Sequence, residues 1–368
     1  MSFRLHRLAA LCLLAFHTAC SSTDSSPAYV SYGADGGPDA EAGLADNDVA
    51  PDAPPDTALF DVQPGDAQPV DDTLLYAHDK STLYAVDPKD PALKLNTVGT
   101  FDCIGPNGEP SMTDLAVDAQ GKLYGVSAHA VFLDMQIDAI GKVVGCTTGK
   151  VPIDAGTAGD ARFYGLTFAP PTAALGNKET LIGANAIGEL YDIDTTDGSL
   201  TLVGRFGAVP ANDGNGHAYD ATHVGKQWGL SGDMVFFGNK GSPVGFATLR
   251  DCEDPSQGPA TCSPVDTLVE IDVTKLAPAG VGGAAVVTKS IRGKVLPAGC
   301  SDESCGFGAM YGIAAYEDRV YGFSYGGSIV SIDNSTGQAK LISSPLTQPG
   351  FAGAGVTTSA RVIPPQPK

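Results

Sequence analysis

The sequence lacks an apolar run long enough to cross a membrane as a helix. A spanning helix needs about 20 apolar residues, whereas the apolar run near the N-terminus, residues 8–16, has nine. This run follows Arg4 and Arg7, and a basic segment before a short apolar stretch is typical of a secretory signal. We therefore predict that residues 1–19 are a signal peptide.

Basic residues are also scarce: the chain has 22 Lys and Arg against 42 Asp and Glu. Residues 21–72 contain 12 acidic residues and no basic one, with recurrent proline. Low hydrophobicity with charge of one sign cannot bury enough surface to offset chain entropy. We predict a disordered tether over residues 20–72, although part of it could serve recognition instead of acting as a plain spacer.

The remaining body retains 20 of the basic and 30 of the acidic residues, so its net charge is −10. A nucleic-acid-binding protein should carry a basic face. The charge therefore argues against nucleic acid as a partner, and equally against adhesion to anionic lipid. Acidity of this kind favours solubility.

Familiar catalytic motifs are missing as well. The sequence contains no Gly-x-Ser-x-Gly elbow, no His-Glu-x-x-His and no phosphate-cradling glycine loop. We accordingly assign no catalytic residues from the sequence.

The residues around Cys20 resemble a bacterial lipobox, in which small residues precede a cysteine that becomes the lipidated N-terminus. Thr18 and Ala19 fit this pattern, while His17 stands where an aliphatic residue is usual. The resemblance implies a lipid anchor on Cys20, and the alternative is an ordinary signal peptide cleaved near Ala19. Ser21 in place of Asp favours sorting to the outer membrane by the same resemblance. We thus expect a lipid-anchored outer-membrane protein, periplasmic or surface-exposed.

Cysteine usage agrees with export. Apart from Cys12 in the signal and Cys20, six cysteines remain, and an even number in an exported chain suggests disulfides. We favour two local pairs, which leave a third, longer one: Cys252–Cys262, Cys300–Cys305 and Cys103–Cys146. The alternative, a zinc site, lacks a Cys-x-x-Cys pair with supporting histidine.

A repeated strand pattern is the most informative feature. Five stretches alternate apolar and polar residues and end in Asp, followed by a turn and a second β-rich run. Alternation predicts half-buried strands, and Asp before Thr-Gly or Asp-Gly is typical of hairpins. The final residues of the five stretches are Asp87, Asp138, Asp194, Asp272 and Asp333. Because they recur at one repeat position, we expect these carboxylates to cap their turns and not to form a ring of ligands.

The repeats predict an all-β fold, a β-propeller of four-stranded antiparallel blades over residues 73–360, with a disordered tail over 361–368. The first copy lacks its opening strand, and the last copy is followed by an unpaired strand at 353–359. A blade built from both chain ends would remove the exposed edge. We count five blades, with a degenerate sixth conceivable in 206–226 or 239–265, and a sandwich or solenoid as the competing fold. The predicted blades are 73–101 with 351–360, 113–147, 163–205, 227–290 and 310–343.

These units resemble exported bacterial propellers with YVTN-like, Leu-Tyr-x-Ile-Asp-x-x-Thr-Gly repeats, an uncharacterised group. The segments ending at Asp87 and Asp194 carry the resemblance best. It implies a propeller and says little about function. WD40 and kelch signatures are absent, and Trp228 is the only tryptophan, whereas quinoprotein dehydrogenases repeat tryptophan in every blade. Sugar-lactonase-like propellers hold a divalent ion centrally, and Asn185, Asp233 and Asn239 match no motif for such a site.

Two segments are candidate sites. Oxygen and imidazole side chains crowd residues 213–223, and they could hold Ca²⁺ or another divalent ion. The favoured alternative is a polar loop that leads into the fourth blade. The residues are Asp213, Asn215, His217, Asp220 and His223. The segment between Cys252 and Cys262 interrupts a blade, and a stapled loop of this kind would be pre-organised for a partner, or be an insertion without function.

The sequence therefore favours a non-enzymatic binding or scaffolding module in the cell envelope, tethered to the membrane by its N-terminal lipid and engaging a protein or glycan through one propeller face. The alternative is a metal-assisted hydrolase or lyase with its site in the propeller channel.

Overall fold

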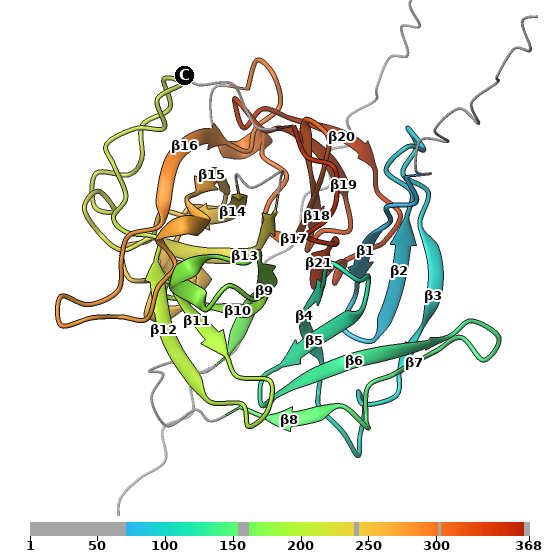
Figure 1. Ribbon diagram of the computed structural model, residues 1–368. Coiled ribbons are helices and arrows are strands. Elements are labelled where there is room, and N and C mark those ends of the chain that lie inside the picture. Colours follow the sequence, from blue (N-terminus) through green and yellow to red (C-terminus); the bar gives the residue numbers. More distant parts are fainter. Residues whose placement is uncertain (1–70, 154–161, 239–242, 301–302, 364–368) are drawn as a thin grey trace, which may run out of the picture. The chain divides into compact units, whose positions relative to one another are not determined.

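The computed structural model describes residues 71–153, 162–238, 243–300 and 303–363, all within one compact unit (Figure 1). These residues form β-strands joined by turns and by 3-10 segments of three residues each. No helix in these ranges has the length and apolar content needed to cross a membrane. The predicted signal, Cys20 and nearly all of the predicted tether lie outside the described residues.

Three of the sheets are separate and have four antiparallel strands in chain order, as the repeat predicted. One contains β9 (Phe163–Ala169), β10 (Thr180–Asn185), β11 (Glu189–Ile193) and β12 (Leu200–Arg205). The next contains β13 (Gly229–Phe237), β14 (Val244–Arg250), β15 (Thr267–Ile271) and β16 (Thr288–Lys294). The last contains β17 (Met310–Tyr316), β18 (Arg319–Ser324), β19 (Ile329–Asp333) and β20 (Ala339–Ser343).

The fourth sheet has nine strands and differs from the prediction of two separate blades. It follows the order β21-β1-β2-β3-β7-β6-β5-β4, with β8 also paired to β6. Its strands are β1 (Leu75–His78), β2 (Thr82–Val86), β3 (Asn96–Phe101), β4 (Met112–Val117), β5 (Leu123–Ser127), β6 (Ala130–Asp138), β7 (Val143–Gly145), β8 (Lys150–Pro152) and β21 (Gly353–Gly355). The join is a parallel pairing of β3 with β7, and the end strands β21 and β4 contact each other, so the sheet nearly closes on itself.

The N- and C-terminal strands pair as predicted. β21 lies antiparallel to β1, with Ala354 opposite Ala77. The described contacts also extend beyond the predicted boundaries: Asp71 accepts a hydrogen bond from the Tyr316 hydroxyl, and Glu317 exchanges backbone hydrogen bonds with Arg361 and Ile363. Pairing of the two ends covers the edge that β1 would otherwise expose.

Five inner strands surround a common centre: β21, β4, β9, β13 and β17 contact one another in a closed circle (Figure 1). Glycines permit this close approach. A Cβ on Gly232 of β13 would lie 2.4 Å from the Cα of Tyr311 in β17, and one on Gly312 would lie 2.6 Å from the backbone of β21. Small residues are therefore required where these strands cross.

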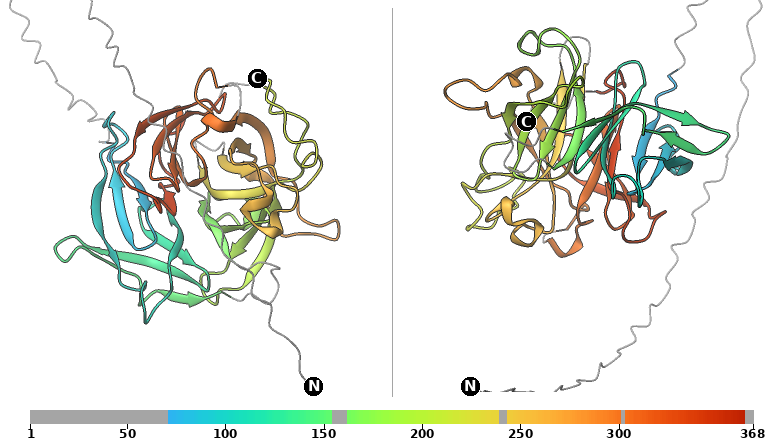
Figure 2. Two further views of the ribbon diagram at one scale, coloured as in Figure 1. Left: turned by 180° about the vertical axis from the view of Figure 1, so that it is seen from behind. Right: turned by 90° about the horizontal axis from the view of Figure 1, so that it is seen from below.

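Apolar side chains fill the layers between neighbouring sheets. Separate core clusters include Phe237 with Phe323, Trp228 with Phe206, and Phe163 with Leu166. Inner strands such as β13 are almost entirely buried, whereas the residues of the outer strand β20 are mostly exposed or half-buried. A hairpin at the β6–β7 turn projects outward (Figure 2) and carries Ile140, which is 99% exposed.

The fourth predicted blade, 227–290, opens with one continuous strand, β13, and its partner is β14. The run Met234–Phe237 is fully buried, so it lacks the alternation that marks a half-exposed strand. The described parts of 206–226 and 239–265 contain no further sheet.

The strand-ending aspartates cap turns, as expected. Asp333 Oδ1 accepts hydrogen bonds from the backbone N–H groups of Ser335 and Thr336. Asp87, Asp138, Asp194 and Asp272 accept from the residue two positions later in the same way.

Candidate functional site

A cavity of about 340 Å³ opens where the inner strands begin. Its wall includes Tyr164 of β9, Ser231 of β13 and Tyr311 of β17. Arg250, at the end of β14, and the loop that follows it complete the wall. Because several sheets and a loop contribute, we call it the mouth cavity. The described residues border two other hollows: one lies on the outer strands of the last sheet, and the other where the inner strands end.

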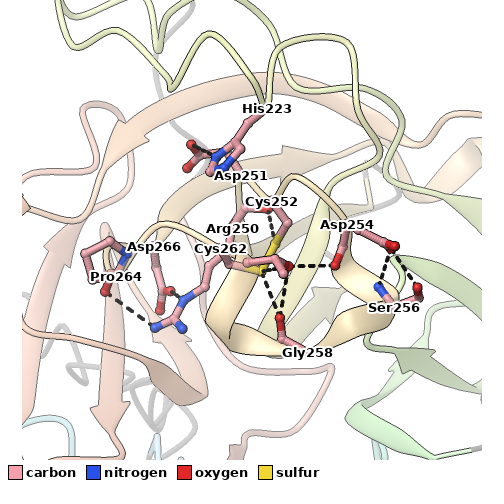
Figure 3. The surroundings of a disulfide bond; sticks show 11 residues. His223, Arg250, Asp251, Cys252, Asp254, Ser256, Gly258, Cys262, Pro264 and Asp266 are labelled. Carbon is pink, nitrogen blue, oxygen red and sulfur yellow. Dashed lines mark hydrogen bonds and ion pairs between the residues drawn. A yellow bond between two sulfur atoms is a disulfide. The ribbon is translucent and has the colours of Figure 1, made fainter.

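The loop over the mouth cavity is fastened by three consecutive residues (Figure 3). Arg250 Nε donates a 2.7 Å hydrogen bond to Asp266 Oδ1. Asp251 Oδ2 lies 2.9 Å from His223 Nδ1, and Cys252 forms a disulfide with Cys262. Since each side chain binds a different segment, the base of the loop is fixed on several sides.

Hydrogen bonds within the loop also fix its conformation. Asp254 caps the short segment η4 (Pro255–Gln257) by accepting from Ser256 N at 3.0 Å. The Thr261 hydroxyl donates to the Asp254 carbonyl at 2.6 Å, and Glu253 N donates to the Thr261 carbonyl at 2.9 Å. A loop held in this way loses little conformational entropy when a ligand binds.

The chemistry of the mouth cavity is unlike that of the whole chain. Its lining contains Arg162 and Arg250 and no Asp or Glu. Tyr311 is half-buried, and desolvation raises the pKa of its hydroxyl, which therefore stays neutral and able to donate. The buried Ser231 hydroxyl has no hydrogen-bond partner among the described residues. The wall thus combines arginine side chains with aromatic rings.

A second polar group lies at the centre of the inner strands. Asp114 of β4 and Asp233 of β13 are fully buried, and their carboxyl groups are hydrogen-bonded to each other. Burial is the main cause that raises both pKa values well above the usual range, and the proximity of the other carboxyl raises that of Asp114 further. Burial thus favours a protonated pair, in which the two carboxyls share a proton.

This acid pair also connects all five inner strands. Leu166 N of β9 donates to Asp114. Asp233 accepts from Ile313 N of β17 at 2.6 Å, and from Ala354 N of β21. Inner-edge N–H groups have no further strand to pair with, and a buried N–H without a partner is costly. The two carboxyls supply the missing acceptors.

His78 of β1 lies next to the acid pair. Its Nε2 and Asp114 Oδ1 would each lie 2.3 Å from a Cβ on Gly353, so only glycine fits between them. Burial lowers the pKa of His78 to about 4, so the ring is neutral at pH 7. His78, Asp114 and Asp233 are fully buried, and they line none of the three cavities described above.

The predicted metal-binding residues are divided among separate contacts. Asp213 binds the backbone N–H of Asn215 and the His217 ring, at 2.8 and 2.9 Å. Asp220 accepts from Thr222, and His223 faces Asp251. Asn215 Nδ2 donates to backbone carbonyls of Arg292 and Thr336, which ties this loop to two sheets. Side-chain geometry thus gives the predicted ion no support.

Within the described ranges, one group of three potential ligands converges: Asp102, Cys103 and Cys146. Its two sulfur atoms form a disulfide, and Asp102 Oδ1 accepts from Cys146 N at 2.8 Å. This group therefore fixes the junction between β3 and β7. All three predicted disulfides are confirmed, including Cys252–Cys262 and Cys300–Cys305.

Sequence reasoning missed the mouth arginines and the acid pair. Asp114 and Asp233 each lie in a strand whose other residues are mostly apolar. An acidic residue in such a strand could have indicated a buried carboxyl. Of the residues compared with sugar lactonases, Asp233 is central, whereas Asn185 binds Glu189 at the end of β10, and Asn239 lies outside the described residues.

No family model matches the chain, and no curated protein is similar to it in sequence. Solved structures with a similar arrangement include a protein of unknown function from Bacteroides caccae, with 7% identity, a TM-score of 0.37 and coverage of 77% of this chain and 98% of that one. A protein of unknown function from Bacteroides thetaiotaomicron has 12% identity and a TM-score of 0.36, with coverage of 73% and 57%.

PorZ, a surface component of the type-IX secretion system of Porphyromonas gingivalis, has 10% identity and a TM-score of 0.29, with coverage of 75% of this chain and 28% of PorZ. The chain thus spans about half of the Bacteroides thetaiotaomicron protein and about a quarter of PorZ. These likenesses are too distant to carry an argument about function.

Proposed function

We propose that this protein is a non-enzymatic binding module of the cell envelope, anchored to the outer membrane by a lipid on Cys20. Its three disulfides indicate an extracytoplasmic protein. The lipid anchor rests on the lipobox-like residues before Cys20, and an anchored domain would keep its binding face near the membrane surface.

The domain is best understood as a five-bladed β-propeller in which the first two blades are fused. β21 with β1–β3 forms one blade, and β4–β8 forms the next; the parallel β3–β7 pairing then joins their outer edges. The closed circle of five inner strands supports this interpretation. Propellers place their ligand sites at the ends of the central channel, where loops from several blades meet.

The main support for a binding function is the mouth cavity, which lies beneath a loop closed by the Cys252–Cys262 disulfide. The cavity is concave, combines apolar and aromatic walls with a few donors, and has a fixed cover, which are the features of a pre-formed ligand site. The alternative of a metal-assisted hydrolase or lyase lacks such support: Asp114 and Asp233 line none of the three described cavities, and Asp213, Asp220 and His223 have separate partners.

Blocking the cavity tests this proposal. The probes are immobilised fragments of envelope polysaccharides, both acidic and neutral, and the protein is the secreted form lacking the lipid. We expect saturable binding of at least one fragment by the wild type, and its loss in Ser231→Trp, which fills the cavity. Gln120→Trp places the same ring at the opposite end of the inner strands and should bind normally.

Two outcomes would contradict the proposal. One is that no fragment binds to the wild type. The other is that Ser231→Trp binds as well as Gln120→Trp while circular dichroism shows that both variants are folded.

A further inference from the structure

The Cys252–Cys262 disulfide belongs to the wall of the mouth cavity, and this distinguishes it from the other two disulfides. Both of its cysteines line the cavity. The cysteines of the other two pairs line none of the three cavities described above, and the pair at the β3–β7 junction is buried. A molecule that enters the mouth cavity therefore meets a disulfide.

The two cysteines of this disulfide differ in their access to solvent. Cys252 is fully buried and packs against β13, where a Cβ on Gly229 would lie 3.0 Å from its sulfur. Cys262, which faces it across an antiparallel bridge, is partly exposed. A thiolate bonds to one sulfur of a disulfide and displaces the other. The structure therefore makes Cys262 the point of attack and Cys252 the leaving group.

The loop base does not depend on the disulfide alone. Backbone hydrogen bonds flank it on both sides: Ser263 N donates to the Asp251 carbonyl at 2.9 Å, and Glu253 N donates to the Thr261 carbonyl at 2.9 Å. These bonds keep the two chain segments side by side when the S–S bond is broken. The two cysteines then still face each other, so the disulfide can form again.

Each sulfur also has a hydrogen-bond acceptor near it. The Arg250 carbonyl oxygen lies 3.6 Å from Cys252 Sγ, and the Gly258 carbonyl oxygen lies 3.7 Å from Cys262 Sγ. A cysteine thiol is a weak donor, and these carbonyls can accept from the two thiols of the reduced form. The cavity wall therefore accommodates both the disulfide and the dithiol.

We propose that the mouth cavity is a site of thiol–disulfide exchange with a low-molecular-weight thiol. The thiolate sulfur of this molecule bonds to Cys262 Sγ, the bond to Cys252 breaks, and Cys252 Sγ keeps the electron pair and takes up a proton. A second thiolate attacks the bound molecule at its sulfur, which releases Cys262 as a thiol and forms the external disulfide. Two external thiols are thus oxidised, one protein disulfide is reduced, and their protons end on Cys252 and Cys262.

The size of the cavity favours a small thiol over a cysteine on a folded protein. Its volume of about 340 Å³ lies within the range of small-molecule sites. The exchange is a property of the wall of the cavity and goes beyond the proposed binding of envelope fragments.

Two matched variants test the proposal, because both lack the same disulfide and each keeps one of its cysteines. Cys252→Ser and Cys262→Ser are incubated with oxidised glutathione, and mass spectrometry follows the mixed disulfide on the remaining cysteine. We expect Cys262 in the first variant to react at least about tenfold faster than Cys252 in the second, because the attacking thiol must be accessible. Adding Ser231→Trp to Cys252→Ser should slow the reaction, whereas adding Gln120→Trp should not.

The native protein provides the second measurement. Reduced glutathione is added, free thiols are blocked with N-ethylmaleimide, and mass spectrometry identifies the modified cysteines. We expect glutathione on Cys262 and a blocked thiol on Cys252. The exposed Cys305 serves as the reference for a disulfide outside the cavity.

Three results would overturn the proposal. They are equal rates at Cys252 and Cys262 in the two variants, an unchanged rate when Ser231→Trp fills the cavity, and a native Cys252–Cys262 bond that stays intact while Cys300–Cys305 is reduced. Binding of envelope fragments is measured separately and without a thiol. The proposed function would therefore stand if the exchange failed, and the exchange would stand if no fragment bound.

Discussion

Replacing Asp114 by Asn should make the protein less sensitive to rising pH. Burial raises the pKa of both carboxyls, and a hydrogen bond joins Asp114 to Asp233. An Asn at this position keeps the shape: its carbonyl can accept from Leu166 N, and its amide can donate to Asp233. Asp233 would then ionise while accepting from Met234 N and Ile313 N.

The sign follows from proton linkage. The pKa of the buried pair is raised above the unfolded value of 3.8, so the folded state keeps a proton that the unfolded chain releases. The stability this pair contributes is complete below pH 3.8 and is lost as pH rises toward the folded pKa. One extra proton corresponds to about 1.4 kcal/mol per pH unit.

Urea unfolding at pH 5, 6, 7 and 8 measures this effect, with the fluorescence of the single, buried Trp228 as the signal. The difference in unfolding free energy, variant minus wild type, should grow by about 1.4 kcal/mol per pH unit while the folded pair stays protonated. Taking the difference between the two proteins removes the contribution of the other titrating groups to the unfolding free energy, because both proteins share those groups. Asp194→Asn, in an exposed turn, is the matched control and should give a constant difference.

A difference between Asp114→Asn and wild type that stays constant from pH 5 to 8 would refute the shared proton. A second variant, Asp114→Ala, separates the effect of shape from that of charge, because alanine leaves Leu166 N and Asp233 without their hydrogen-bond partner. We expect that variant to lose about 3 kcal/mol or more at every pH.

Four further predictions concern a disulfide, the closing strand, the lipid anchor and the predicted ion. Replacing Cys103 and Cys146 together by Ala should cost about 4 kcal/mol in urea unfolding, from the chain entropy of a loop of 43 residues; a loss below 1 kcal/mol would show that the β3–β7 junction holds without it. A chain ending at Pro349 lacks β21 and should bind a hydrophobic dye and resist folding, whereas a native-like melting curve would mean that closure is dispensable. Cys20→Ala should move the protein from the membrane pellet to the soluble fraction, and unchanged pelleting would exclude the lipid anchor. EDTA should leave urea unfolding of the wild type unchanged, and a lower urea midpoint would support the ion predicted at residues 213–223.

The sequence alone determined the local structure. A strand followed by Asp and a Gly turn predicts its own hairpin, as at Asp194 and Asp333, because the carboxylate caps backbone groups only two residues away. The short spacing of Cys252 from Cys262 likewise restricted their pairing. The missing first strand and the surplus last strand predicted closure, since an unpaired edge must be covered.

Only the tertiary structure decided what meets at the centre and between the sheets. The parallel pairing of β3 with β7 leaves no mark in the alternation of either strand, because each already has an antiparallel neighbour. Asp114 and Asp233 belong to different sheets, and Arg162 and Arg250 reach one cavity from different strands. The sequence shows whether a side chain is polar, but which residue it contacts depends on how the sheets pack around their shared axis.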